Sequence, residues 1–158
     1  MKVLGIDPGT AACGYGIVHG SEGRLRALVH GCWSTRPTQR QDLRLKTIFD
    51  GVAGLIAEHA PDAVAIEESY VGADARIALS VGQARGAVLV ACAAGGVEAV
   101  EYAPAHVKQA VCGYGRADKA QVQRMVRLVL GIEVRNVHAS DALAVAICHV
   151  TAPKRVAA

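Results

Sequence analysis

The hydrophobic positions of the first 35 residues follow the spacing of strands. Apolar runs cover residues 2–6 and 14–18, and a turn-forming Pro-Gly pair lies between them. Residues 24–35 alternate between apolar and polar side chains, which predicts a third strand with one apolar face. That face carries Leu25, Ala27 and Val29. Because the links between these strands are short, they predict an antiparallel meander.

The spacing becomes helical after residue 40. Over residues 41–59, apolar side chains recur every three or four positions, which predicts an amphipathic helix. Its apolar face is formed by Leu45, Ile48, Phe49, Val52, Leu55 and Ile56. Pro61 breaks this helix, and the unbroken apolar run 63–66 suits a central strand that is covered on both faces.

The second half of the chain alternates between helices and one more strand. The predicted elements are an Ala/Gly-rich helix over 74–94, a strand over 97–102 and a short helix over 104–108. A further helix is capped by Asp118, and its apolar stripe is formed by Val122, Met125, Val126, Val129 and Leu130. A last helix covers about 138–150. This order predicts an α/β fold with a five-stranded mixed sheet flanked by helices. Three antiparallel strands come first, and two more are added by helical crossovers. At 158 residues, the chain 1–158 fits one domain.

Composition narrows the class of protein. The chain is 52% hydrophobic, yet no apolar run reaches membrane-spanning length without a charge or several glycines. No basic stretch followed by an apolar run marks a signal peptide at the N-terminus. We therefore expect a soluble cytoplasmic protein that does not bind membranes. The five cysteines show no CxxC spacing, which argues against both a disulfide framework and a zinc site.

The net charge is only +3, but the basic residues are clustered. Between residues 24 and 46, six basic side chains face one acid, and between residues 108 and 135, six face two. Two basic patches on a nearly neutral protein suggest a polyanionic partner. Solvated surface charge explains each patch about as well when it is taken alone.

Acidic side chains stand at the ends of two predicted buried strands. Asp7 follows the first strand and Glu67 follows the strand over 63–66, while His138 and Asp141 share one face of the last helix at i, i+3 spacing. Carboxylates brought close together repel unless they are protonated or bridged by cations. Oxygen ligands favour Mg²⁺ or Mn²⁺, and one imidazole tilts the preference toward Mn²⁺. Two such ions can activate water and stabilise the leaving oxygen of a phosphodiester.

Each of these residues also has a simpler interpretation. Asp7 could bond the turn amides of Gly9 and Thr10. His138 could be an ordinary residue at a helix start, and Asp141 could be a capping acid. Their joint appearance favours a metal site.

Five sequence blocks, in order and covering nearly the whole chain, resemble the RuvC family of bacterial Holliday junction resolvases. They are Gly5-Ile6-Asp7-Pro8-Gly9, Ala65-Ile66-Glu67, Gly82-Gln83-Ala84-Arg85-Gly86, Val107-Lys108-Gln109 and Ser140-Asp141-Ala142-Leu143-Ala144. The resemblance implies an RNase H-like fold, a homodimer, and paired symmetric nicks in a four-way DNA junction during homologous recombination and DNA repair. Branch-migration partners, RuvA and RuvB, follow by family analogy alone. The helix that carries Gly82 and Gly86 is our candidate for the dimer contact.

The resemblance also implies catalytic roles. Asp7, Glu67 and Asp141 match the family's catalytic acids, with Asp7 expected to bridge two ions and the other two to complete their shells. His138 stands where the family more commonly has aspartate, which leaves its role open between metal ligand and general base. Glu68 is given no catalytic role.

Several residues are expected to contact DNA. By the resemblance, Lys108 and Lys119 approach the DNA near the scissile phosphate, and Tyr70 stacks on unpaired bases at the junction. A lysine such as Lys119 in a first helical turn faces the unfavourable end of the helix dipole, which a nearby phosphate would explain. A solvated lysine and a tyrosine folded onto the core are the simpler alternatives. We also expect Arg76 and Arg116 to contact DNA.

Three other functions are weighed against this interpretation. The start of the chain is similar to the phosphate loop of sugar kinases, actin and Hsp70, but 158 residues leave no room for their second domain. An RNA-processing nuclease of the RuvX type shares the strand-and-acid start, and the Lys108 and Gly82–Gly86 blocks disfavour it. The third is a junction-binding scaffold that lost catalysis through the change at His138.

Overall fold

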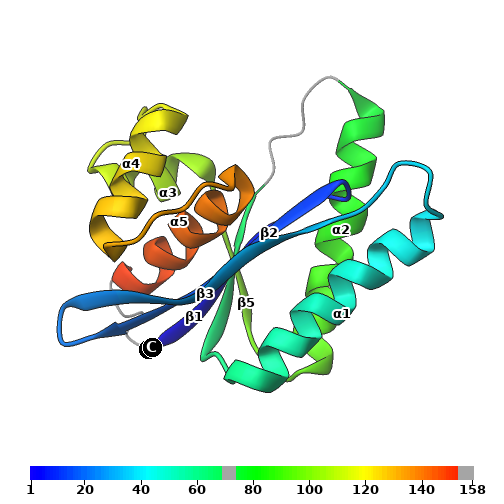
Figure 1. The fold of residues 1–158 in the computed structure, drawn as a ribbon, viewed down its shortest axis with the longest axis horizontal. Coiled ribbons are helices and arrows are strands. Elements are labelled where there is room, and N and C mark those ends of the chain that lie inside the picture. The colour runs from blue at the N-terminus through cyan, green and yellow to red at the C-terminus, as the bar shows by residue number, and fades with distance from the viewer. Residues whose placement is uncertain (69–73, 153–158) are drawn as a thin grey trace, which may run out of the picture.

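The computed structural model describes residues 1–68 and 74–152 (Figure 1). Its elements, in chain order, are β1 (Lys2–Asp7), β2 (Ala12–Ser21), β3 (Arg24–Ser34), α1 (Gln41–His59), β4 (Ala63–Glu67), α2 (Ala75–Ala94), β5 (Ala99–Tyr102), α3 (Pro104–Cys112), α4 (Lys119–Leu130) and α5 (Val137–Thr151). The helix predicted over 104–108 therefore continues to Cys112. It ends there because Gly113 adopts a left-handed conformation with φ of 84°.

The strands form one five-stranded mixed sheet in the order β3-β2-β1-β4-β5. The three N-terminal strands pair antiparallel, whereas β4 pairs parallel with both β1 and β5. The predicted architecture is confirmed, including the two strands that helical crossovers add. Since β1 and β4 lie side by side at the centre, their carboxyl ends meet at the same edge of the sheet.

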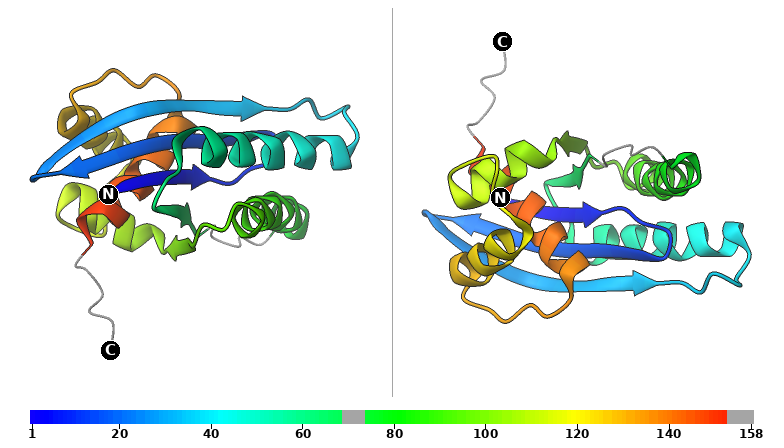
Figure 2. Two further views of the ribbon diagram at one scale, coloured as in Figure 1. Left: turned by 90° about the horizontal axis from the view of Figure 1, so that it is seen from below. Right: turned by 90° about the horizontal axis from the view of Figure 1, so that it is seen from above.

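Helices cover both faces of the sheet (Figures 1 and 2). One apolar cluster joins α1 and α2 to the face that carries Leu4, Ile6 and Ile66. A second cluster joins α3, α4 and α5 to the opposite face, on the side of Val3 and Ala65. Because both faces are packed, β1 and β4 are nearly continuous runs of buried residues.

The predicted single apolar face of β3 is wrong. Leu25 and Ala27 pack with the α5 cluster, whereas Val29 packs with the α1–α2 cluster. The register between β2 and β3 shifts at this point, so that Leu28 is an extra residue and is 37% exposed. A bulge of this kind reverses the faces beyond it. On α4, Val129 is likewise 38% exposed and does not belong to the buried stripe.

The helix α2 has two apolar faces. Its inner face buries Ala84, Val88, Ala91 and Cys92 in the α1–α2 cluster. Its outer face carries Leu79 and Val90, which are 65% and 60% exposed. By length and composition alone, α2 is the one helix of the described residues that could cross a membrane, which is weak evidence because core helices pass the same test.

Candidate active site

The strand order places Asp7 and Glu67 beside each other. The parallel register pairs Gly5 with Ala65 and Ile6 with Ile66, and the two acids are the last residues of their strands. Side chains alternate between the faces of a strand, so Asp7 lies on the face of Gly5, against which α5 packs. Both carboxylates therefore project from the sheet edge toward the start of α5.

Asn136 determines where α5 begins. Its side-chain oxygen accepts a hydrogen bond of 3.0 Å from the backbone N–H of Ala139, which caps the helix. His138 consequently lies in the first turn, and Asp141 lies one turn further on the same side. The alternative that Asp141 is a capping acid is wrong, because Asn136 fills that position. The Asn136 cap was missed in the sequence, although an asparagine before an apolar helix is a recognisable start signal.

Two glycines let α5 lie directly on the sheet. A Cβ atom added at Gly5 would stand 1.9 Å from the carbonyl oxygen of Ala142, and one added at Gly14 would stand 2.0 Å from that of His138. No larger residue fits either position without moving the helix. This close approach brings His138 and Asp141 over the ends of β1 and β4.

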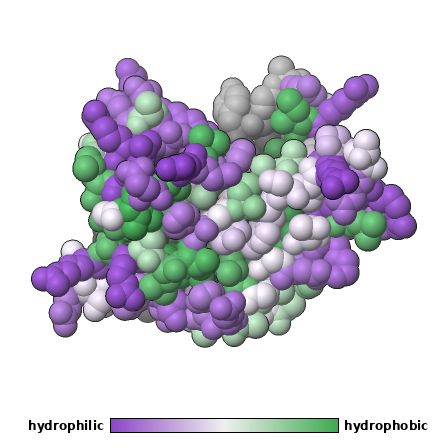
Figure 3. Space-filling model, viewed as in Figure 1, coloured by the Kyte–Doolittle hydropathy of each residue, from purple (hydrophilic) through white to green (hydrophobic). Residues whose placement is uncertain are grey.

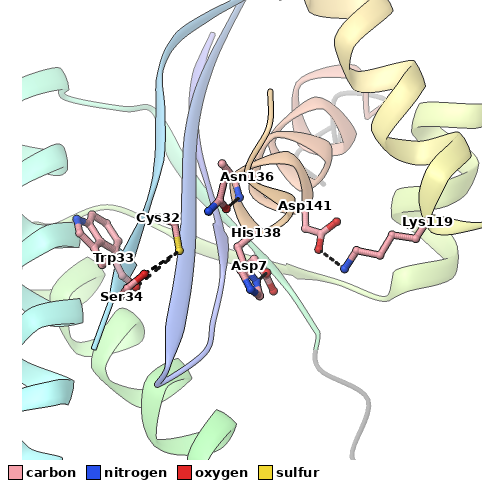
Figure 4. A network of polar contacts seen from close by, with 9 residues as sticks. Asp7, Cys32, Trp33, Ser34, Lys119, Asn136, His138 and Asp141 are labelled. Atoms are coloured by element: carbon pink, nitrogen blue, oxygen red, sulfur yellow. Dashed lines mark hydrogen bonds and ion pairs between the residues drawn. The ribbon is translucent and has the colours of Figure 1, made fainter. Parts of the chain in front are cut away.

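Two polar pairs face each other across the site (Figure 4). His138 Nδ1 lies 3.0 Å from Asp7 Oδ2, and Lys119 Nζ lies 2.8 Å from Asp141 Oδ2. These side chains line one cavity of about 420 Å³, whose walls are formed by Asp7, Glu67, Glu68, Pro104, Val107, Lys108, Lys119, Val122, His138, Asp141 and Ala144. The structure thus brings together the acids, the histidine and both lysines that were predicted from the sequence. Glu68, to which the sequence analysis assigned no catalytic role, also lies in the wall of this cavity.

Two carboxylates of this cavity, those of Glu67 and Asp7, lie in an environment that disfavours their charge. Burial raises the pKa of Glu67 to about 7, and the negative charges of Asp7 and Asp141 add to this shift. Burial also raises the pKa of Asp7, although the hydrogen bond with His138 opposes the shift. The pKa of Lys119 is raised by its hydrogen bond to Asp141. A positive charge near Glu67 and Asp7 would therefore stabilise their ionised forms.

The raised pKa of Glu67 predicts how the stability of the fold changes with pH. A carboxyl with a raised pKa keeps its proton in the folded state after the unfolded chain has released its own, so stability falls as pH rises from about 4.5 to about 7. Without divalent ions, Glu67→Gln is expected to stabilise the protein by about 1–3 kcal/mol at pH 8 and to have little effect at pH 4. Thermal unfolding at both pH values measures this. Glu133→Gln, at an exposed position, is the control.

Adding Mn²⁺ should reverse the order of stability. An ion that binds only the folded protein raises its melting temperature, and Glu67→Gln removes the charge of a predicted metal-binding side chain. Wild-type protein is expected to gain more from Mn²⁺ than the variant does. An equal gain would count against Glu67 as a metal ligand.

The donor set fits a divalent cation in its chemistry. Four carboxylates, those of Asp7, Glu67, Glu68 and Asp141, line the cavity with one imidazole, and oxygen donors are those that Mg²⁺ and Mn²⁺ prefer. Within residues 1–68 and 74–152, no three acid, imidazole or thiol groups already stand in a geometry that could hold a metal ion. Asp141 is instead partnered by Lys119, and Asp7 by His138. The ligand roles stay a prediction.

The residues predicted to contact DNA fall in different places. Lys108 and Lys119 line the cavity, and Arg116 is exposed in the loop between α3 and α4. Arg76 lies at the start of α2, beside a second cavity. Tyr70 lies outside the described residues. Figure 3 shows a mainly hydrophilic surface over α3 and α4, the region of the second basic cluster.

His149 has a separate environment. Its Nδ1 lies 2.9 Å from the hydroxyl of Tyr102, and it is not part of the cavity wall. Burial lowers its pKa. This contact gives the side chain a structural partner on β5.

Comparison with known proteins gives one consistent family. Residues 3–149 match the family model described as crossover junction endodeoxyribonuclease RuvC. The curated RuvC of Moorella thermoacetica is 49% identical over 151 residues, which cover 94% of this chain and 90% of that protein. The RuvC of Trichlorobacter lovleyi is 50% identical over 151 residues, covering 95% and 85%.

Two solved structures of Holliday junction resolvases share the fold of this chain. Thermus thermophilus RuvC, in complex with a Holliday junction substrate, superposes with a TM-score of 0.90 at 39% identity, covering 94% of this chain and 92% of that one. The yeast mitochondrial Holliday junction resolvase has a TM-score of 0.68 at 12% identity, covering 94% and 78%, and shares the fold.

Proposed function

This chain belongs to the RuvC family of crossover junction endodeoxyribonucleases, and from that premise we propose how its residues cut a four-way DNA junction. The chain is an endonuclease that resolves Holliday junctions in recombination and repair. The observation that carries the residue assignment is the single cavity lined by Asp7, Glu67, Asp141 and His138 with two lysines. We assign catalysis to this cavity within one nuclease domain over residues 1–158.

The four acidic and imidazole side chains would hold the metal ions on which the family depends. The chemistry that two bound divalent ions supply is activation of the attacking water and stabilisation of the leaving oxygen. Glu67, with its pKa of about 7, changes charge near neutral pH and responds to any cation brought near it. Asp7 contacts His138, so this acid and the imidazole act as a unit.

The two lysines orient and neutralise the DNA backbone. Lys119 reaches Asp141 at 2.8 Å and is 61% exposed, so its ammonium group is held at the mouth of the site. A phosphate entering the cavity meets this charge and that of Lys108. Lys119 would offset the charge that develops on the phosphate during attack. Arg116 and Arg76 would contact DNA outside the cavity, and Tyr70 would stack on an unpaired base.

His138 gives a prediction for metal preference. An imidazole ligand favours Mn²⁺ over Mg²⁺ relative to a carboxylate. Wild-type protein is expected to cleave with Mn²⁺ at least as well as with Mg²⁺, and His138→Asp is expected to lower the Mn²⁺/Mg²⁺ rate ratio. Initial rates on a labelled junction, at saturating concentrations of each metal, measure both. Cleavage by wild type with Mg²⁺ alone would exclude His138 as a ligand and leave the general-base role.

The outer face of α2 is the surface we assign to a second copy of the chain. Leu79, Gly82, Gly86 and Val90 follow the spacing of one helical stripe. A Cβ atom added at Gly82 or Gly86 meets nothing within 4 Å, so the stripe offers a close approach to another helix. Two symmetric cuts need two active sites, and a two-fold dimer presents one to each strand.

Gly86→Arg tests the dimer. The arginine has room to fold in the monomer but places a charge at the centre of the stripe. We expect sedimentation to show a dimer for wild type and a monomer for the variant at the same concentration. Leu128→Arg, on the exposed surface of α4, should leave the dimer intact. A wild-type protein that is monomeric at working concentration would contradict this assignment.

Cleavage of a labelled four-way junction, a linear duplex and an RNA, each with Mn²⁺, tests the function as a whole. We expect paired nicks in the junction alone. Preferred cleavage of RNA, or binding without cleavage, would contradict the proposal. A cytoplasmic location and cooperation with RuvA and RuvB are further parts of it that rest on family analogy.

A further inference from the structure

A second cavity lies against the catalytic residues on the side away from the first. It has a volume of about 480 Å³, and Asp7 and His138 belong to its wall as well as to that of the active-site cavity. The remaining wall comes from the β1–β2 loop, residues 8–11, from Ala12 at the start of β2 and from the first turns of α2. A group bound in this cavity would therefore lie beside Asp7 and His138, two residues of the proposed active site.

The wall is mainly apolar and carries one cationic side chain. Pro8, Ala11, Ile77 and Val81 supply apolar surface. Ile77 is 64% exposed, so its aliphatic side chain is accessible to a ligand in this cavity. Arg76 stands at the rim, where a phosphodiester backbone would pass. Apolar walls beside a cation match the two parts of a nucleotide, a flat base and an anionic link.

Hydrogen bonds hold the two sides of the cavity together. The Thr10 hydroxyl donates to the backbone carbonyl of Ser80 at 2.8 Å and accepts from the Ser80 hydroxyl at 2.8 Å. The Thr35 hydroxyl donates to the carbonyl of Thr10 at 2.6 Å. Thr10 is only 4% exposed, so the residue at the centre of this network is buried. The loop after Asp7 is thus tied to α2, and the cavity is formed before any ligand arrives.

We propose that this second cavity is a subsite for the base of a nucleotide that flanks the scissile phosphate. The base lies against the apolar wall of Ile77 and Ala11, and Arg76 contacts the adjoining phosphate. Because the cavity shares Asp7 and His138 with the active site, occupancy of the subsite places the scissile bond over the catalytic acids. This inference rests on the proposed function, since it requires a DNA strand in the first cavity.

The experiment compares cleavage of junctions that carry or lack one base. An abasic nucleotide is placed immediately 5′ or 3′ of the scissile phosphodiester, and rates are measured with wild type, Ala11→Trp, Ile77→Ala and the control Leu128→Trp. Covering roughly 40–80 Å² of apolar surface with a base corresponds to about a 5- to 30-fold gain in binding. We expect wild type to lose a factor in this range on one of the two abasic junctions.

The variants test the assignment to this cavity. Ala11→Trp fills it and is expected to cleave the intact junction as slowly as wild type cleaves the abasic one, with the base-dependent ratio reduced to about 1. Ile77→Ala should reduce the ratio in part, and the exposed Leu128 position should leave it unchanged. Fluorescence of 2-aminopurine at the same nucleotide, bound to the non-cleaving Asp7→Asn variant, gives a second readout. Fluorescence is expected to rise, because the base leaves its neighbours in the DNA stack for a wall that carries no Phe, Tyr or Trp side chain among the described residues, and Ala11→Trp in that background should abolish the rise.

The outcomes separate the two claims. If wild type cleaves no junction, the proposed function fails. If wild type cleaves intact and abasic junctions equally at both positions, or if Ala11→Trp folds and retains the full ratio, the nuclease function stands and the subsite is overturned. Unchanged 2-aminopurine fluorescence on binding would overturn it as well.

Discussion

Asp7→Asn is expected to abolish cleavage while junction binding persists. Asp7 stands where both cavities meet and contacts His138, and asparagine keeps its shape but removes its charge. We propose that this carboxylate holds ions that activate water, so we expect its loss to lower the rate by at least about 10³-fold, equivalent to about 4 kcal/mol. Binding depends mainly on contacts between basic residues and phosphates, which the substitution leaves in place.

Single-turnover cleavage and gel-shift affinity, measured on the same labelled junction, distinguish the two effects. Asp42→Asn is the matched control, because this acid lies on the exposed start of α1 with Arg40 as its partner. It should leave both quantities unchanged. A variant at Asp7 that still cleaves at a rate near that of wild type would refute the catalytic assignment.

Gly14→Ala is expected to slow cleavage, because the added Cβ atom displaces the backbone of α5. The added Cβ would stand 2.0 Å from the carbonyl oxygen of His138 and 3.0 Å from the amide nitrogen of Ala139, so the first turn of α5 must move away from β2. Overpacking of this kind costs about 1–3 kcal/mol of stability. Because that turn carries His138, we expect cleavage to fall by about 10²-fold even where the protein remains folded.

Gly54→Ala is the control for this change. Gly54 lies inside α1, and an added Cβ there meets nothing within 4 Å. Alanine in a helix interior is favoured over glycine, so this variant should gain about 0.5–1 kcal/mol and keep full activity. Thermal unfolding and cleavage rates, measured for both variants, check the prediction. If Gly14→Ala cleaves as fast as Gly54→Ala, close packing of α5 does not position the site.

Much of the fold could be read from local patterns. Apolar spacing marked the helix over 41–59 and the central strand over 63–66, because burial on one face or on both leaves a period in the sequence. Errors arose where a single residue broke the period. Because Leu28 is an extra residue, Val29 lies on the other face of the strand. The alternation of residues 24–35 contains no signal that predicts this bulge.

The candidate site was accessible from sequence for a related reason. An acid directly after a buried strand is costly unless it has a partner, so Asp7 and Glu67 were conspicuous as individual residues. Their pairing depends on β1 and β4 being parallel neighbours, which a chain order alone does not require. The contact of Lys119 with Asp141 depends likewise on how α4 packs on α5.

By itself, the sequence determined which elements form and which residues carry the chemistry, since both depend on side-chain type and short-range spacing. Only the tertiary structure decided that Gly5 and Gly14 let α5 approach the sheet, that Lys119 partners Asp141, and that a second cavity opens beside Asp7. These features arise where separate elements of the chain meet, such as Lys119 on α4 with Asp141 on α5, or Thr10 with Ser80, which is 70 residues further along the chain. The physical reason is that close packing between distant segments depends on volumes and register, which no local period records.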